Sequence, residues 1–222
     1  MTEMEAIRAR HTVRKYTQQA LSPELRRQLD EKIAALNAQH ALRMRLITGD
    51  GRAFGRLLRL TLAKGVQNYL VLVGENRADV DEKLGYCGIQ VALLAQRLGL
   101  NSWWVAGTYS RKKVAQIVEL QAAEKLTGVI ALGYGAEMGK PHKSKTIEQV
   151  SDYQGAPPSW FTSGVEAALL APTALNRQAF HLSGQGGTVT LTTPEGAPSG
   201  ADRGIVRYHF EVGAGTENFS WR

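Results

Sequence analysis

The chain has 222 residues, 43% of them hydrophobic and 21% charged, a balance typical of a globular protein with a full core. It contains no uncharged apolar run of about 18 residues, which excludes the usual kind of membrane-spanning helix. A single cysteine, Cys87, excludes an internal disulfide framework, and the acidic N-terminus has no apolar core typical of a signal peptide. We therefore expect one domain over residues 1–222 in a reducing cytoplasm.

The net charge of +7 is unevenly distributed along the chain. Residues 1–65 hold 13 Lys and Arg against 6 Asp and Glu, whereas the remainder balances at 14 against 14. Such an excess suits a phosphorylated ligand or nucleic acid, and solvated basic helix faces are the plainer alternative.

The first third is predicted to alternate helices with extended segments. Ser22 followed by Pro23 and Glu24 is a typical helix start, with an N-cap and an acid in the first turn. The hydrophobic pattern predicts, in order, a helix at 3–9, an extended segment at 10–16, a helix from 22 to about 37, a half-buried strand at 41–48, a basic amphipathic helix at 54–62 and a buried strand at 69–73.

The extended segment at 10–16 carries a candidate anion site. In an extended chain Arg10, Thr12 and Arg14 face the same side. Arg offers planar forked donors to phosphate, so two guanidinium groups and a hydroxyl form a chemically sensible clamp. A solvated basic loop is the alternative.

The stretch from Val80 to Gly107 predicts a central buried helix followed by a strand. Its apolar residues recur at three- and four-residue steps, and its second half is apolar almost all round. Gly85 and Gly88 each cost roughly 1 kcal/mol of helix propensity, so another backbone or a flat ring is expected close by. The strand at 103–105 ends at Ala106 and Gly107, whose bare backbone can approach a ligand. A core helix and strand without a ligand is the alternative.

The remainder predicts further short elements and a second pair of basic residues. In order we expect a helix at 110–120, a strand at 129–132 that ends in the turn Gly133-Tyr134-Gly135, a linker at 151–158, a helix at 160–170, and an antiparallel pair of strands at 188–192 and 205–211. Lys143 and Lys145, two positions apart, are further anion contacts. We find no internal repeat, metal-ligand cluster, phosphate-binding GxxxxGK loop or Ser-His-Asp set.

Four separated segments together resemble the nitroreductase family of FMN-dependent oxidoreductases. They are RHTVRKY at 10–16, the central helix with its strand to Ala106-Gly107, LGYG at 132–135 with the later Lys143-Ser144-Lys145, and APTALNRQAF at 171–180. The last resembles the family's APSAxNxQPW, but it stands late in the chain, as in a branch with rearranged order, and it has Ala179 and Phe180 in place of Pro and Trp. In the first motif His11 and Thr12 replace Arg and Ser.

The resemblance implies an α+β fold, a mainly antiparallel sheet flanked by helices with a long central helix, binding FMN. Division into two lobes, 1–150 and 158–222 joined by 151–157, is an alternative to one undivided domain. The cofactor-binding residues implied are Arg10, His11, Thr12, Arg14, Ala106, Gly107, Gly133, Lys143, Lys145, Pro172, Thr173, Ala174, Asn176 and Gln178. No catalytic side chain is expected, since a flavin carries its own redox chemistry.

The activity implied is hydride transfer from NAD(P)H to the flavin and then to an electron-poor acceptor, such as a nitroaromatic, quinone or enone, in a homodimer formed through the central helix. Two alternatives remain. The protein binds FMN for sensing or structure without turnover, or it is a nucleic-acid module that uses its basic first third. The second is disfavoured because that third lacks aromatic residues interleaved with basic ones.

Overall fold

The computed structural model describes residues 1–196 and 199–222. Its helices are α1 (Glu3–Ala9), α2 (Pro23–His40), α3 (Arg56–Leu60), α4 (Val80–Arg97), α5 (Arg111–Ile117), α6 (Ile147–Val150), α7 (Ser159–Leu169) and α8 (Ser199–Ala214), with short 3-10 turns at Gly51–Ala53 and Ala174–Asn176. Its strands are β1 (Arg45–Ile47), β2 (Asn68–Glu75), β3 (Asn101–Val105), β4 (Glu124–Gly133), β5 (Ser151–Tyr153), β6 (His181–Gln185), β7 (Thr188–Thr192) and β8 (Ser220–Trp221).

The first sheet has the order β1-β2-β4-β3 and every pairing in it is antiparallel. The central strand β2 reads as a continuous apolar run because both of its faces are covered. Leu70 and Leu72 pack on the α4 side, whereas Tyr69, Val71 and Val73 belong to a second core under α3 and α5.

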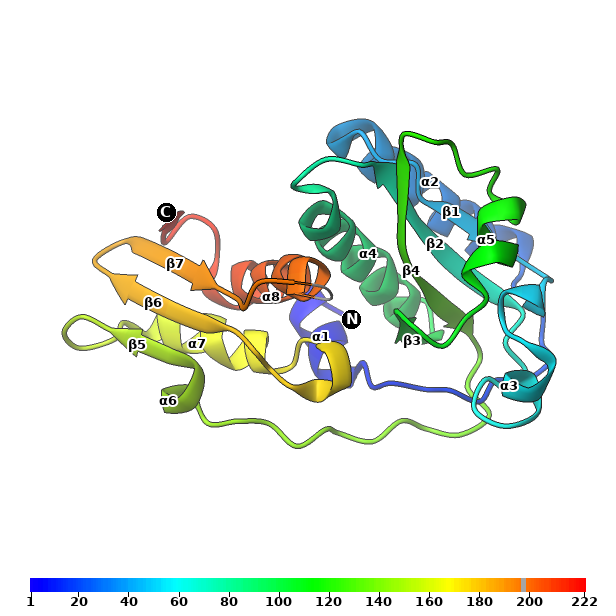
Figure 1. The fold of residues 1–222 in the computed structure, drawn as a ribbon. Helices are drawn as coiled ribbons and strands as arrows, with labels where there is room; N and C mark the ends of the chain where they lie inside the picture. The colour runs from blue at the N-terminus through cyan, green and yellow to red at the C-terminus, as the bar shows by residue number, and fades with distance from the viewer. Residues whose placement is uncertain (197–198) are drawn as a thin grey trace.

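The second sheet has the order β5-β6-β7-β8. Its middle pair β6–β7 is antiparallel and both outer pairs are parallel. Figure 1 shows α4 and α8 side by side between the two sheets, with α7 against the second sheet. The α+β class and the central helix are thus confirmed.

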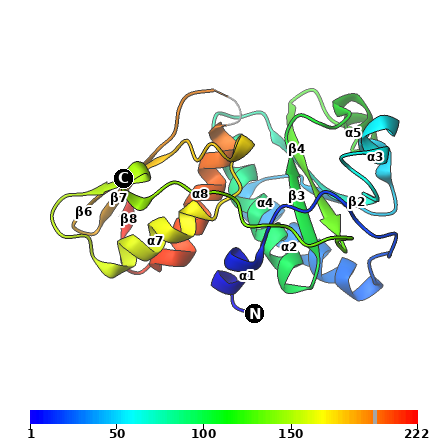
Figure 2. The ribbon, with the colours of Figure 1, turned by 90° about the horizontal axis from the view of Figure 1, so that it is seen from below.

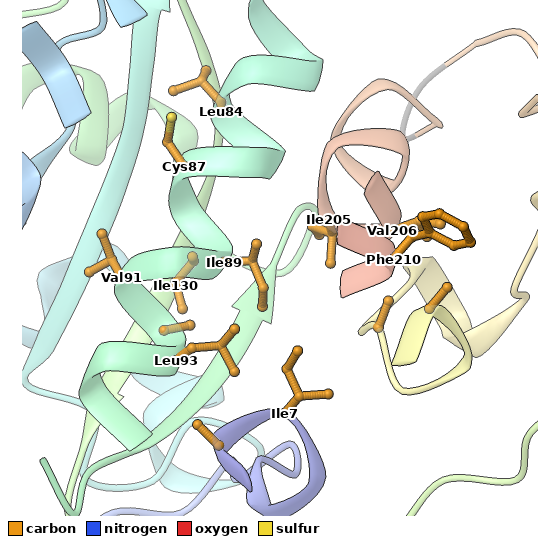
Figure 3. Packing of buried hydrophobic residues seen from close by; sticks show 14 of the residues in the cluster. Ile7, Leu84, Cys87, Ile89, Val91, Leu93, Ile130, Ile205, Val206 and Phe210 are labelled. Atoms are coloured by element: carbon orange, nitrogen blue, oxygen red, sulfur yellow. The ribbon is translucent and has the colours of Figure 1, made fainter. Parts of the chain in front are cut away.

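The central helix α4 packs closely against α8. A Cβ atom placed at Gly85 would collide with the carbonyl oxygen of Ala201, and one at Gly204 would collide with that of Glu82. The backbone expected near Gly85 is therefore that of α8. In Figure 3, Ile205 points from α8 toward α4, while Phe210 points to the other side, where it meets Gly164 of α7.

The reciprocal contact reveals an internal repeat that the sequence did not disclose. Apart from the 3-10 turn Gly51–Ala53 and α3, which lie between β1 and β2, the unit α2-β1-β2-α4-β3 has the same order of helices and strands as α7-β6-β7-α8-β8. Both α4 and α8 end at a left-handed glycine, Gly99 (φ 81°) and Gly215 (φ 75°), and each is followed by a strand that contains Ser-Trp. In the first unit β4 lies between β2 and β3, which run parallel to each other. The repeat lies in the order and direction of the elements and does not appear as a repeat in the amino-acid sequence.

Two predictions were wrong. Residues 205–211 are not a strand but the middle of α8, where Ile205, Val206, His209 and Phe210 are buried at helical spacing. The antiparallel partner of β7 is β6, joined to it at Gly186-Gly187. The predicted linker begins with the edge strand β5, whose Asp152 accepts hydrogen bonds from His181 (2.6 Å) and Ser183 (2.9 Å) of β6.

Candidate functional site

The N-terminal motif and the chain after β4 run antiparallel beside each other. The amide of Thr17 donates to the carbonyl of Tyr134 (2.8 Å), and that of Ala136 donates to the carbonyl of Lys15 (2.9 Å). Figure 2 shows the two segments crossing the same side of the first sheet. Further along, Gly139 lies against His11, where an added Cβ would come within 2.6 Å of the His11 Cβ. Segments 125 residues apart are thereby brought together.

Arg10 is a buried cation without a partner among the described residues. Only 4% of the residue is exposed, and its Nε is enclosed with no hydrogen-bond acceptor. Burial lowers the pKa of this guanidinium to about 10. No carboxylate of the described chain pairs with it. A buried charge left uncompensated is costly, so this position calls for an anionic ligand.

Two histidines, His11 and His209, lie within the influence of the Arg10 charge, and the sequence pointed only to His11. The pKa of His11 is lowered by partial burial and by the charges of Arg10 and His142. His209 on α8 is fully buried, and burial lowers its pKa to about 3. Its Nδ1 donates to the carbonyl of Ile205 (2.9 Å), so Nε2, which has no partner, is left as an acceptor. His209 was missed because its segment was predicted as a strand.

The loop from Pro172 to Gln178 is strained and anchored at several points. Leu175, Asn176 and Gln178 all adopt left-handed backbone conformations, with φ of 52°, 54° and 46°. Such non-glycine conformations cost about 1–3 kcal/mol each and concentrate at functional sites. The amide of Ala174 donates to both carboxylate oxygens of Asp202 at 3.1 and 3.0 Å.

Hydrogen bonds join this loop to the second basic pair. The Asn176 side chain donates to the carbonyl of Lys143 (2.7 Å), and the Gln178 side chain accepts from the amide of Lys145 (2.7 Å). Lys145 Nζ donates to the carbonyl of Gln178 (2.9 Å), and Gln178 Nε2 donates to that of Leu169 (2.8 Å). Gln178 is 1% exposed and therefore ties segments together rather than facing an open site.

The remaining predicted residues lie along β3. Thr12 bridges Ser102 near the start of this strand, whereas Ala106 and Gly107 are exposed beyond its end. Ser102 and Gly107 are five positions apart along extended chain, roughly 16 Å, a span that suits an elongated ligand. A Cβ at Gly107 would meet nothing within 4 Å, whereas Gly133 is packed against Tyr16 and does not line open space.

A cavity of about 160 Å³ opens beside Thr12 and Arg14. Its lining residues are Thr12, Val13, Arg14, Lys15, Thr61, Leu62, Glu137, Met138 and Gly139. The guanidinium of Arg14 lies 5.6 Å from the centre of the Trp103 ring, so it stacks on β3 at the mouth of this cavity. A larger hollow of about 470 Å³ runs along the exposed face of α2, far in sequence from every predicted site residue except the N-terminal motif, and is lined largely by ion-paired side chains such as Arg27 and Glu31.

Among residues 1–196 and 199–222, no cluster of acidic, histidine or cysteine side chains is arranged to hold a metal ion. In the same residues no helix is both long and apolar enough to cross a bilayer.

The family of this chain follows from sequence and fold together. Residues 2–214 match the family described as "Putative TM nitroreductase", so the chain belongs to that nitroreductase family. FMN is the cofactor of nitroreductases, which confirms the expected flavin. No curated protein matches the chain in sequence.

Solved structures of similar fold agree with this assignment. A Thermotoga maritima protein described as a "putative nitroreductase" aligns with a TM-score of 0.70 at 19% identity, covering 96% of this chain and 83% of its own. A Bacteroides thetaiotaomicron protein described as a "Putative NADH dehydrogenase/NAD(P)H nitroreductase" has a TM-score of 0.53 at 17% identity, covering 67% of this chain and 95% of its own. At these identities the likeness establishes the nitroreductase fold.

Proposed function

We propose that this chain is an FMN-dependent oxidoreductase whose cofactor lies along β3, between the Arg10 motif and the 172–178 loop. When bound, the flavin would accept a hydride from NADH or NADPH and pass electrons to an electron-poor acceptor such as a nitroaromatic, quinone or enone. The observation that carries the proposal is Arg10. Its buried guanidinium has no partner in the described chain, and a phosphate would supply the missing charge.

The chain's own residues have distinct parts in this proposal. Arg10, His11, Thr12 and Arg14 hold the phosphate and the polar tail, together with Lys143 and Lys145 across the antiparallel segment. The exposed backbone of Ala106 and Gly107 receives the ring, because the space there is open. The loop of Pro172, Thr173, Ala174 and Asn176 closes the site, and Gln178 and Gly133 support it from within.

The homodimer expected through the central helix stays a prediction. Within α4 only Arg97 is exposed, and α8 packs closely along this helix within the same chain. The family loop at 171–180 is also supplied by this chain's second repeat. We therefore propose that one chain completes the site. A cytoplasmic location also remains part of the proposal, supported by the buried lone cysteine Cys87.

The test replaces Arg10 with methionine, which keeps an apolar stem without the charge. We expect FMN affinity to fall about ten- to a hundredfold, because a hydrogen bond to a charged group contributes roughly 1.5–3 kcal/mol. Riboflavin, which lacks the phosphate, should bind both proteins alike. The FMN-free variant should be more stable than FMN-free wild type, since an uncompensated buried charge has been removed.

The exposed residue Arg8 gives the matched control, and Arg8→Met should change neither FMN binding nor stability. Equal losses of FMN and riboflavin affinity in Arg10→Met would contradict the phosphate contact. A yellow protein that binds FMN but never oxidises NAD(P)H with a nitroaromatic would instead favour flavin binding without turnover.

A further inference from the structure

Most of the excess positive charge of the molecule lies in three segments that adjoin beside the proposed site. Three segments adjoin there, 10–18, 50–66 and 137–145: the Tyr16 amide donates to the carbonyl of Lys64 (2.9 Å), and Lys15 pairs with Glu137 (3.1 Å). Together they contain ten Lys and Arg against two acidic residues, in a chain whose net charge is +7. The charge of these segments therefore accounts for the excess.

The two acidic residues in these segments are already engaged. Asp50 pairs with Arg52 at 2.7 Å, and Glu137 pairs with Lys15 at 3.1 Å. In the described part of the chain, Arg56 forms no ion pair with a carboxylate. This cation on α3 is thus available to a ligand.

The same segments expose large apolar side chains. Leu57 and Leu60 of α3 are 75% and 73% exposed, Leu62 is 40% exposed, and Met138 is 78% exposed. Leu62 and Met138 also line the 160 Å³ cavity beside Thr12. A gathered apolar surface rimmed by charge is typical of a binding site rather than of a solvated face.

The segment that bears these side chains spans the two ends of the site. At one end Lys64 is tied to Tyr16. At the other, the Ser110 amide, just past Gly107, donates to the carbonyl of Ala53 (2.7 Å). Between them Phe54 stacks on Trp103 of β3, with ring centres 5.8 Å apart. Residues 51–66 therefore border β3 between its contact with the N-terminal motif and the chain just past Gly107.

We infer that this surface, defined by Arg56, Leu57, Leu60, Leu62 and Met138, selects the electron acceptor, and that it favours apolar aromatic acceptors that carry a negative charge. The inference rests on the proposed function and specifies its substrate class. The leucines and Met138 cover an aromatic body, and the unpaired arginine attracts a carboxylate or sulfonate. A neutral or cationic acceptor of the same shape gains only the apolar contact.

The test uses three nitroaromatics of similar size and different charge: 4-nitrobenzoate, 4-nitrobenzamide and 4-nitrobenzyltrimethylammonium. Each receives two electrons and two protons, with NADPH as the reductant, and the nitro group becomes a nitroso group with loss of water. For each compound, kcat/KM of the variant is divided by kcat/KM of the wild type, so that differences in how easily the three compounds are reduced cancel. Arg56→Glu should lower kcat/KM for the anion about tenfold, leave the neutral compound nearly unchanged and raise kcat/KM for the cation.

The matched control is Arg77→Glu, at the other end of β2, which should leave all three values unchanged. Leu57→Ser with Leu60→Ser should raise KM for all three compounds without changing their order. If the three compounds respond equally to Arg56→Glu while FMN is retained and NADPH still reduces the enzyme, the charge selection is wrong and the oxidoreductase stands. A protein that takes up no FMN would defeat the proposed function itself.

Discussion

At the scale of single residues, the site is built from polar groups that the protein buries at a cost. Arg10 and His209 each keep an enclosed nitrogen without a partner in the described chain, and Asp202 keeps a largely buried carboxylate whose only hydrogen bonds there come from Ala174. Native interiors pair nearly all such groups, so the two unpartnered nitrogens of Arg10 and His209, which lie near each other, indicate a binding site.

Asp202 gives a pH-dependent prediction. Burial raises its pKa to about 6 from an ordinary 3.8, so the folded protein binds this proton more tightly than the unfolded chain does. The contribution to stability is therefore complete below about pH 4 and is lost as the pH rises to about 6. Two pKa units correspond to about 3 kcal/mol, and Asp202→Asn, which keeps an oxygen for the Ala174 amide, should recover about 2 kcal/mol at neutral pH.

Urea unfolding of both proteins at pH 4 and pH 7.5 measures this effect. The variant should gain on wild type only at the higher pH, and Asp202→Ala, which cannot accept the hydrogen bond, should not gain as much. Equal differences at both pH values would show that Asp202 does not titrate in this range.

At the scale of helices and strands, the sequence predicted those elements whose hydrophobic periodicity fits only one type of secondary structure. The buried strand β2 and the helices α1, α2 and α4 were found because their apolar residues repeat clearly and because capping residues mark the starts of α1 and α2. The helix α8 was missed for two reasons. Ile205, Arg207, His209 and Glu211 alternate with the apolar residues between them, as in a strand, and the glycines of α8 lower its helix propensity.

The site was predicted in the same uneven way. Arg10, Lys143, Lys145 and Asn176 were named from motifs, and hydrogen bonds to backbone atoms bring the last three together in the structure. Asp202 and His209 were not named, since their importance depends on tertiary burial, which a local pattern does not encode.

The glycines of the α4–α8 contact provide a prediction at this scale. Gly85→Ala would gain about 1 kcal/mol in helix propensity but would force its methyl group into the Ala201 carbonyl. Overpacking of this kind costs about 1–3 kcal/mol, so we expect a net loss of stability. Gly55→Ala is the control, because a Cβ there meets nothing within 4 Å. Thermal unfolding of both variants measures this loss of stability. An unchanged midpoint for Gly85→Ala would mean that α4 and α8 can move apart to accommodate the methyl group.

At the scale of the whole molecule, the two repeats divide the work. The first supplies the antiparallel sheet and the strand β3, and the second supplies the 172–178 loop of the proposed site, while α4 and α8 pack between the sheets. The loop between α7 and β6 has no counterpart between α2 and β1, where Ala41 alone turns the chain with a φ of 53°. We accordingly expect one cofactor site per chain.

Because α4 and α8 belong to one chain, their packing against each other does not depend on the protein concentration. Two such helices on separate chains would associate less as the protein is diluted, whereas here the connecting chain holds them at a fixed effective concentration. The unfolding temperature should consequently stay constant over about a hundredfold dilution of the FMN-free protein. A midpoint that falls with dilution would reveal a second chain in the folded unit. If the midpoint stays constant, the smallest folded unit is a single molecule, which keeps its fold even where it is too scarce to meet another copy of itself.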